Sequence, residues 1–176
     1  LTGVVSRIEP RTGGVSIKIS SNSEFTEAML SASERIKGEE LHEGDRIKVY
    51  VVEVRKSTRG PQVLISRTHP GLVKRLFELE VPEIFDGTVE IKSIAREAGS
   101  RTKMAVWSDD PAVDPIGACV GPRGGRVAPI VGEPGGEKIA IIQSNQSPEE
   151  DNAWPPSPAR VTEGVFGPDG KSFPVT

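Results

Sequence analysis

The residues best suited to contact a ligand form a glycine-rich segment between two short apolar stretches. In chain order they are Gly121, Pro122, Arg123, Gly124, Gly125 and Arg126. Glycine has no Cβ, so a sugar-phosphate chain can approach the backbone closely at Gly121 and Gly124. A helix that begins after the segment would offer free N–H groups to a phosphate, and the two arginines would add positive charge. The spacing predicts a phosphate-contacting turn. An ordinary turn between helices is the competing interpretation in a chain with 19 glycines.

Residues that could support catalysis or hold a metal are few. Cys119 is the only cysteine, and the two histidines, His42 and His69, fall in predicted loops of another domain, so a nucleophile would have no adjacent base. Asp109 and Asp110 precede a proline, which is typical of a turn. The glycine-rich segment does not run directly into a Gly-Lys-Ser/Thr sequence, as a nucleotide-binding loop would require. We therefore expect no catalytic residue, no metal site and no cofactor.

The charge distribution permits a nucleic-acid partner despite a net charge of −3. Residues 146–176 carry two basic and five acidic residues, so the acidic excess lies largely in this tail. One cysteine excludes a disulfide framework, and no run of about 18 apolar residues could span a bilayer. The chain begins at Leu1 without an apolar signal segment. We therefore expect a cytoplasmic protein with no membrane partner.

Residues 1–68 show short alternating apolar runs separated by turn residues, which is typical of a small antiparallel barrel. Five strands are expected, at 3–8, 15–19, 25–30, 46–54 and 62–66. A five-stranded barrel of this length indicates an OB-fold, whose sheet and loops commonly bind oligonucleotides. A basic hairpin loop is expected at 55–61. The candidate contacts of this secondary RNA site are Phe25, Tyr50, Arg55, Lys56 and Arg59.

A connector helix is expected at residues 69–80. Leu72, Leu76 and Leu79 recur at i, i+4 and i+7, as the buried stripe of an amphipathic helix requires, and Val73 and Phe77 widen the stripe. The other end of the chain, residues 143–176, has sparse apolar residues and prolines that would interrupt every helix. This composition favours an extended tail that contributes little to the folded core.

The second domain, residues 81–142, mixes strands and helices. Strands are expected at 88–95, 101–107 and 137–142, and two short helices flank the glycine-rich segment. This order resembles the bacterial KH domain, helix-strand-strand-helix-helix-strand, in which a Gly-x-x-Gly loop clamps about four nucleotides of single-stranded RNA. The helix before the loop would supply Ile116 and Val120 as an apolar floor for the bases. The expected fold class is α+β and multidomain: an S-one type OB-fold β-barrel followed by an α/β KH domain.

Four segments make the resemblance specific to one family. They are SRTHP at 66–70, LFELEVPEI at 76–84, AREAGSRTK at 95–103 and DPIGACVG at 114–121, which look like the S-one and first KH domains of the NusA family of bacterial transcription factors. The resemblance implies a non-enzymatic protein that binds nascent single-stranded RNA and modulates pausing, termination and antitermination. It implies RNA polymerase as a partner, mainly through an amino-terminal domain absent here, and other Nus factors. Residues 143–176 would be a divergent start of a second KH domain. The alternative function is a protein-interaction scaffold in which the loop is only a turn.

Overall fold

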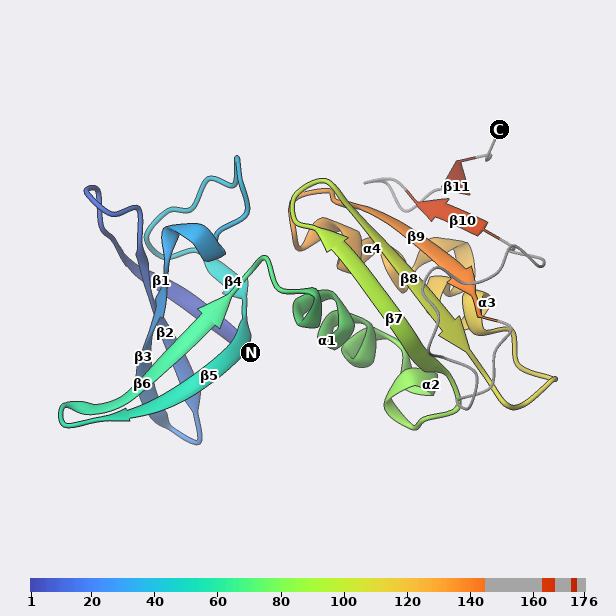
Figure 1. The fold of residues 1–176 in the computed structure, drawn as a ribbon, viewed down its shortest axis with the longest axis horizontal. Helices are drawn as coiled ribbons and strands as arrows, with labels where there is room; N and C mark the ends of the chain where they lie inside the picture. Colours follow the sequence, from blue (N-terminus) through green and yellow to red (C-terminus); the bar gives the residue numbers. More distant parts are fainter. Residues whose placement is uncertain (145–162, 167–171, 174–176) are drawn as a thin grey trace. The chain divides into compact units, whose positions relative to one another are not determined.

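The computed structural model describes residues 1–144, 163–166 and 172–173. The chain divides into two compact units, Leu1–Leu72 and Val73–Thr176. The first unit is built mainly from strands, and the second combines a sheet with helices (Figure 1). The predicted mixed α+β class is therefore confirmed. Among the described residues, no helix is long and apolar enough to cross a membrane.

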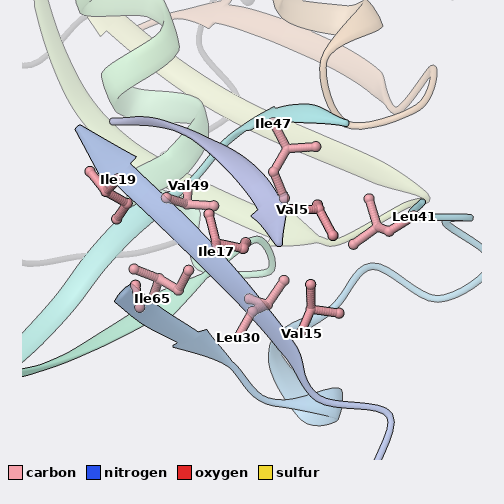
Figure 2. Packing of buried hydrophobic residues seen from close by; sticks show 10 residues of the cluster. Val5, Val15, Ile17, Ile19, Leu30, Leu41, Ile47, Val49 and Ile65 are labelled. Carbon is pink, nitrogen blue, oxygen red and sulfur yellow. The ribbon is translucent and has the colours of Figure 1, made fainter. Parts of the chain in front are cut away.

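The first unit is a six-stranded sheet with the order β4-β1-β2-β3-β6-β5. Its strands are β1 Thr2–Ile8, β2 Val15–Ser21, β3 Glu24–Leu30, β4 Arg46–Lys48, β5 Tyr50–Ser57 and β6 Gly60–Ser66, and a short 3-10 helix, η1, spans Ala32–Glu34. Neighbouring strands are antiparallel except β3 and β6, which run parallel. Alternate side chains of these strands point into one core because successive residues of a strand face opposite sides. Figure 2 shows this cluster, in which Val15, Ile17 and Leu30 are fully buried.

The fourth predicted strand, 46–54, differs from the structure because it is divided in two. Val49 separates β4 from β5, and its backbone N–H donates to the carbonyl of Leu1 at 2.8 Å. The side chain of Val49 is buried in the core (Figure 2). Strands β4 and β5 consequently lie at opposite ends of the strand order, β4 beside β1 and β5 beside β6. The observed sheet has six strands where five were expected.

The hairpin predicted at 55–61 is present, but its loop is shorter than predicted because most of that segment is strand. Strand β5 extends to Ser57 and β6 begins at Gly60, so only two residues form the turn. The hydroxyl of Ser57 donates to the carbonyl of Gly60 at 2.9 Å and accepts the N–H of Arg59 at 3.3 Å. Gly60 has φ +110°, which side chains rarely tolerate. These local features close a two-residue hairpin, and Arg55 and Lys56 are therefore strand residues.

The second unit carries a five-stranded sheet with the order β11-β10-β9-β8-β7, in which only the β8 and β9 pair is parallel. Its strands are β7 Glu90–Glu97, β8 Arg101–Trp107, β9 Lys138–Gln143, β10 Glu163–Phe166 and β11 Ser172–Phe173. Its helical segments are α1 Pro70–Glu80, which begins at the end of the first unit, α2 Pro82–Phe85, α3 Pro115–Val120, η2 Pro122–Gly124 and α4 Val127–Gly132. Helices α3 and α4 lie behind the β7-β8-β9 part of the sheet (Figure 1). Val127, Ile130 and Val131 of α4 are fully buried.

The tail was expected to be extended and to lie outside the core. Most of it, residues 145–162, 167–171 and 174–176, lies outside the described residues. Its first two residues are part of the folded unit, because Gln143 ends β9 and Ser144 is buried. The other described parts are β10, which pairs antiparallel with β9, and β11, which pairs with β10.

The predicted apolar stripe of α1 is partly wrong. Leu72, Val73, Leu76 and Phe77 are buried as expected, but Leu79 is 71% exposed. At 100° per residue the buried face is centred between the Leu72 and Val73 rows, and Leu79 points roughly 90° away from it. The predicted stripe identified the helix and four of its buried residues, and only the inclusion of Leu79 was wrong.

In each unit, a buried arginine among the described residues has its guanidinium held by a glutamate distant in sequence. In the first unit, Arg67 Nε donates to Glu39 Oε2 at 3.0 Å and its Nη1 donates to the carbonyl of Lys48 at 2.6 Å. In the second, Arg96 donates twice to Glu137, at 2.8 and 2.9 Å, and both side chains are 0% exposed.

The Glu137 carboxylate also accepts bonds from the Thr102 hydroxyl and from the N–H of Gly99. This buried network joins β7 and β8 to the residue that precedes β9. Since a buried charge is costly when it loses its partner, the network should decide the stability of the second unit.

We expect Glu137→Gln to destabilise the second unit by about 3 to 5 kcal/mol, because it leaves the buried Arg96 cation without its counter-charge. Glu97→Gln is the matched control, since the Glu97 and Arg101 pair lies on the same unit with side chains 67% and 79% exposed. Removing such an exposed pair should cost at most about 1 kcal/mol. Urea unfolding of both variants measures the difference, and equal midpoints would show that the buried pair is not needed for stability.

Candidate nucleic-acid interface

The glycine-rich segment forms a compact turn between α3 and α4. The N–H of Gly121 donates to the carbonyl of Gly117 at 2.9 Å, and the N–H of Arg126 donates to the carbonyl of Val120 at 3.1 Å. Within the turn, Gly124 N–H donates to the Gly121 carbonyl at 3.2 Å, and Gly125 N–H donates to the carbonyl of Pro122. The backbone donors of three successive residues, 124–126, are therefore used by the turn itself. The expected supply of free N–H groups to a phosphate does not come from them.

The backbone of the turn passes through the left-handed region at three positions. Gly121 has φ +73°, Arg123 has φ +55° and Gly124 has φ +73°. Gly124 is also buried, whereas Pro122 and Arg123 at the tip are exposed. A non-glycine residue in this region is strained, so both glycines are required by the backbone conformation. The turn therefore needs its glycines whether or not a ligand binds. The space that they leave for a ligand is a further result of the same residues.

Arg126 points to the protein and not to open solvent. Its Nη1 donates to Glu83 Oε2 and to the carbonyl of Ala118, each at 2.8 Å. A Cβ added to Gly121 would lie 2.6 Å from the Cγ of Arg126, so the arginine stem occupies the space beside that glycine. The structure thus separates the two arginines of the segment: Arg123 is at the exposed tip and Arg126 is bonded beneath it.

The apolar residues predicted beside the turn are on α3. Ile116 and Val120 are half-buried, and Cys119 between them is fully buried. Spacing of four residues places Ile116 and Val120 on one side of the helix, in consecutive turns. The half-buried pair lies on the helix that leads directly into the turn.

The secondary contacts predicted in the first unit differ in how accessible they are to a ligand. Phe25 on β3 is 76% exposed, and Arg59 in the hairpin turn borders a hollow that also includes Arg7, Met29 and Gln62. Tyr50 stacks on His69 with ring centroids 4.6 Å apart and planes 12° apart, so one face of its ring is covered. Lys56 is exposed on β5.

Arg55 is also on β5 and is bonded to a neighbouring carboxylate. Its Nε donates to Glu53 Oε2 at 3.0 Å, and this bond and the Glu53 charge raise the pKa of Arg55. Phe25, Lys56 and Arg59 are therefore better placed for a ligand than Tyr50 and Arg55.

One residue at the turn, Glu83, was not singled out from the sequence. It lies on α2, 43 positions before Arg126, and its carboxylate accepts the arginine side chain. The segment 76–84 contains it, but nothing in the local spacing of that segment indicates a partner so far along the chain.

The chain is similar in sequence to known proteins over the segment that contains the turn. A family described as the NusA-like first KH domain matches residues 67–144. Over 176 residues the chain is 49% identical to the transcription termination/antitermination protein NusA of Bacillus subtilis, covering 99% of this chain and 46% of that protein.

The NusA proteins of Halalkalibacterium halodurans and Thermus thermophilus are 52% and 46% identical to the chain over 175 residues, again covering 99% of this chain and 44% of each relative. The chain spans less than half the length of these curated relatives. These similarities place the chain in the NusA family of transcription termination/antitermination proteins, over a segment that contains the first KH domain.

Proposed function

We propose that this chain is a non-enzymatic RNA-binding segment of a transcription elongation, termination and antitermination factor, and that it holds single-stranded nascent RNA at the turn 121–124. The observation that carries the proposal is the exposed tip of the turn, Pro122 and Arg123, in a NusA-like first KH domain. RNA polymerase, contacted mainly through an amino-terminal part of the whole protein, and other Nus factors are the further partners of this proposal.

The chemistry of the turn suits a phosphate backbone with bases lying to one side. Arg123 supplies an exposed cation at the tip, which attracts phosphate. Ile116 and Val120 supply a half-buried apolar surface on the adjacent helix, on which base faces can lie without losing hydrogen bonds to water. The candidate site thus comprises a charged tip and an apolar floor, with Gly121, Gly124 and Gly125 shaping the backbone between them.

The first unit assists as an S-one type OB barrel in this proposal. Two features support a barrel: the parallel pairing of β3 with β6, and the single residue, Val49, between the strands at the two ends of the sheet order. The run of chain that contains β4, Val49 and β5 could then close the sheet, because β4 pairs with β1 and β5 pairs with β6. Phe25, Lys56 and Arg59 are its available RNA contacts, and base stacking on Phe25 would tolerate any sequence.

A protein-interaction scaffold is the second candidate function. It is favoured by the hydrogen bonds that the turn makes to itself and by the engagement of Arg126 with Glu83, both of which a purely structural turn would show. The two functions differ in whether the charge of the tip matters for RNA affinity.

An enzymatic role has little chemical support. Burial, followed by the negative charge of Glu83, raises the pKa of Cys119 to about 12. A thiol with this pKa stays protonated near neutral pH and is a poor nucleophile. The described residues contain no group of three or more His, Cys, Asp or Glu side chains that could hold a metal ion.

We expect the double substitution Pro122→Asp/Arg123→Asp to lower affinity for a single-stranded RNA pool at least tenfold, which is about 1.4 kcal/mol, because it places two negative charges where phosphate would lie. Both positions are exposed, and Asp tolerates the left-handed backbone of residue 123. Substitution of Gly124 would be a weaker test, since that residue is buried with positive φ.

The control is Pro122→Asn/Arg123→Asn, which has nearly the same shape without the charges. Filter binding at fixed salt, with melting curves for both variants, measures the effect. Equal affinity of a folded Asp variant and the wild type would favour the scaffold.

Arg123→Asn should weaken RNA binding less than the double aspartate variant and reduce the slope of log affinity against log salt by about 0.7, the value for one phosphate contact on a single strand. Asparagine suits the positive φ at this position better than alanine, so the backbone should be kept. Affinity measured at four or more salt concentrations gives the slope. An unchanged slope would mean that Arg123 makes no phosphate contact.

Cys119 in the folded protein should react with iodoacetamide at pH 8 roughly a thousandfold more slowly than in the urea-unfolded chain, because burial keeps its thiol protonated and inaccessible. Mass spectrometry of timed samples measures the modified fraction. Rapid alkylation under native conditions would contradict the raised pKa and would reopen a chemical role for this residue.

A further inference from the structure

Arg126 contacts three separate parts of the second unit, which is more than a surface cation requires. Its stem lies against Gly121, where an added Cβ would be 2.6 Å from its Cγ and 3.0 Å from its Cβ and Cδ. Its guanidinium reaches both α3, through the Ala118 carbonyl, and α2, through Glu83. Its backbone N–H donates to the carbonyl of Val120. One residue therefore joins the start and the end of the turn to a neighbouring helix.

The Ala118 carbonyl belongs to the last turn of α3, where carbonyls lack partners within the helix. The side chain of Arg126 satisfies this acceptor at 2.8 Å. A movement of the arginine would leave the carbonyl to water and would uncover Gly121. The end of α3 and the first glycine of the turn are thus held by the same side chain.

Glu83 is the fixed end of this arrangement. Its carbonyl accepts the N–H of Val89 at 2.8 Å, so its backbone is tied to the residue before β7. The N–H of Asp86 donates to the Pro82 carbonyl at 2.9 Å, and this bond closes the helical turn that contains Glu83. The Glu83 side chain is 34% exposed and that of Arg126 is 30% exposed, so the bond lies at the surface but is not fully solvated.

The turn needs such an external support because its conformation is strained. Arg123 has φ +55°, a region that costs a non-glycine residue roughly 1 kcal/mol or more. Strained backbone persists only where the surrounding structure holds it in place. The contacts of Arg126 are among the interactions that bind the two ends of this turn to the rest of the unit.

We propose that Arg126 and Glu83 are positioning residues of the RNA-binding turn: their ion pair holds Gly121 and the Arg123 tip in the conformation that accepts RNA, and Arg126 does not itself bind phosphate. The inference rests on the proposed RNA-binding function. It reverses the expectation that Arg126 is a direct RNA contact, since its charge is already used by Glu83.

The proposal predicts an effect of opposite sign from simple electrostatics. The Glu83 carboxylate is negative and lies near the turn, so its long-range effect on phosphate is repulsive. If Glu83 acted only through its charge, Glu83→Gln would strengthen RNA binding. If Glu83 positions the turn through Arg126, the same substitution weakens binding.

We expect Glu83→Gln to weaken RNA binding about threefold to fivefold, a range that a partly exposed ion pair can supply. The salt slope should stay unchanged, because no phosphate contact is lost. Backbone amide exchange of residues 121–126 should become faster in the RNA-free protein, while the melting temperature changes little. Glu97→Gln is the control, since it removes a carboxylate from an exposed ion pair elsewhere on the same unit.

Arg126→Lys provides the second test. Lysine keeps the positive charge, but its side chain is shorter and its ammonium stops short of the position of Arg126 Nη1, which donates to both Glu83 and the Ala118 carbonyl. A positioning role therefore predicts the same loss of affinity as in Arg126→Gln. A direct phosphate contact predicts instead that Arg126→Lys binds as the wild type does and that Arg126→Gln lowers the salt slope by about 0.7. That result, or tighter RNA binding by Glu83→Gln, would overturn the proposal.

The aspartate variant of residues 122 and 123 distinguishes this failure from a failure of the proposed function. Lost RNA binding in that variant with wild-type binding in Glu83→Gln and Arg126→Lys would retain the RNA site and reject the positioning pair. Wild-type binding in the aspartate variant would reject the RNA site, and the positioning pair with it.

Discussion

The left-handed backbone between α3 and α4 is the constraint on which the candidate site depends. Gly121, Arg123 and Gly124 all have positive φ, and this reversal lets two short helices meet with an exposed tip between them. Only glycine adopts such angles without strain, so the glycines are required whether or not RNA binds. What makes the turn a candidate site is its surroundings: an exposed cation at the tip and half-buried apolar residues on the preceding helix.

The arginines of this protein divide into those that hold the fold and those that face solvent. Arg67 and Arg96 are bonded to buried or partly buried glutamates, and Arg126 is bonded to Glu83 and to the end of a helix. Arg123 and Arg59, in contrast, are exposed in turns. A net charge of −3 is therefore a poor guide to nucleic-acid binding, because affinity depends on the cations that remain accessible to phosphate.

Local sequence patterns were sufficient to predict the positions of most helices and strands. Strand β8 lies at 101–107 as predicted, and β7 and β9 differ from their predicted positions by one or two residues at each end. Errors arose where a tertiary contact overrides a local signal. The basic residues at 55–56 read as loop but pair with β6, and Leu79 continues a leucine repeat but points to solvent because the buried face is centred on other rows of α1.

The sequence alone predicts the mixed α and β elements and the glycine turn with its two flanking helices, since periodicity and turn chemistry are local properties. The likeness to the NusA family rests separately on the resemblance of the segments 66–70, 76–84, 95–103 and 114–121. The sequence leaves open which charged side chains are free. Glu83 and Arg126 are 43 positions apart and Arg96 and Glu137 are 41 apart, and only the folded chain brings each pair within hydrogen-bonding distance. The role of an arginine beside the turn was therefore decided by tertiary structure, because a cation's function depends on the partner that neutralises it.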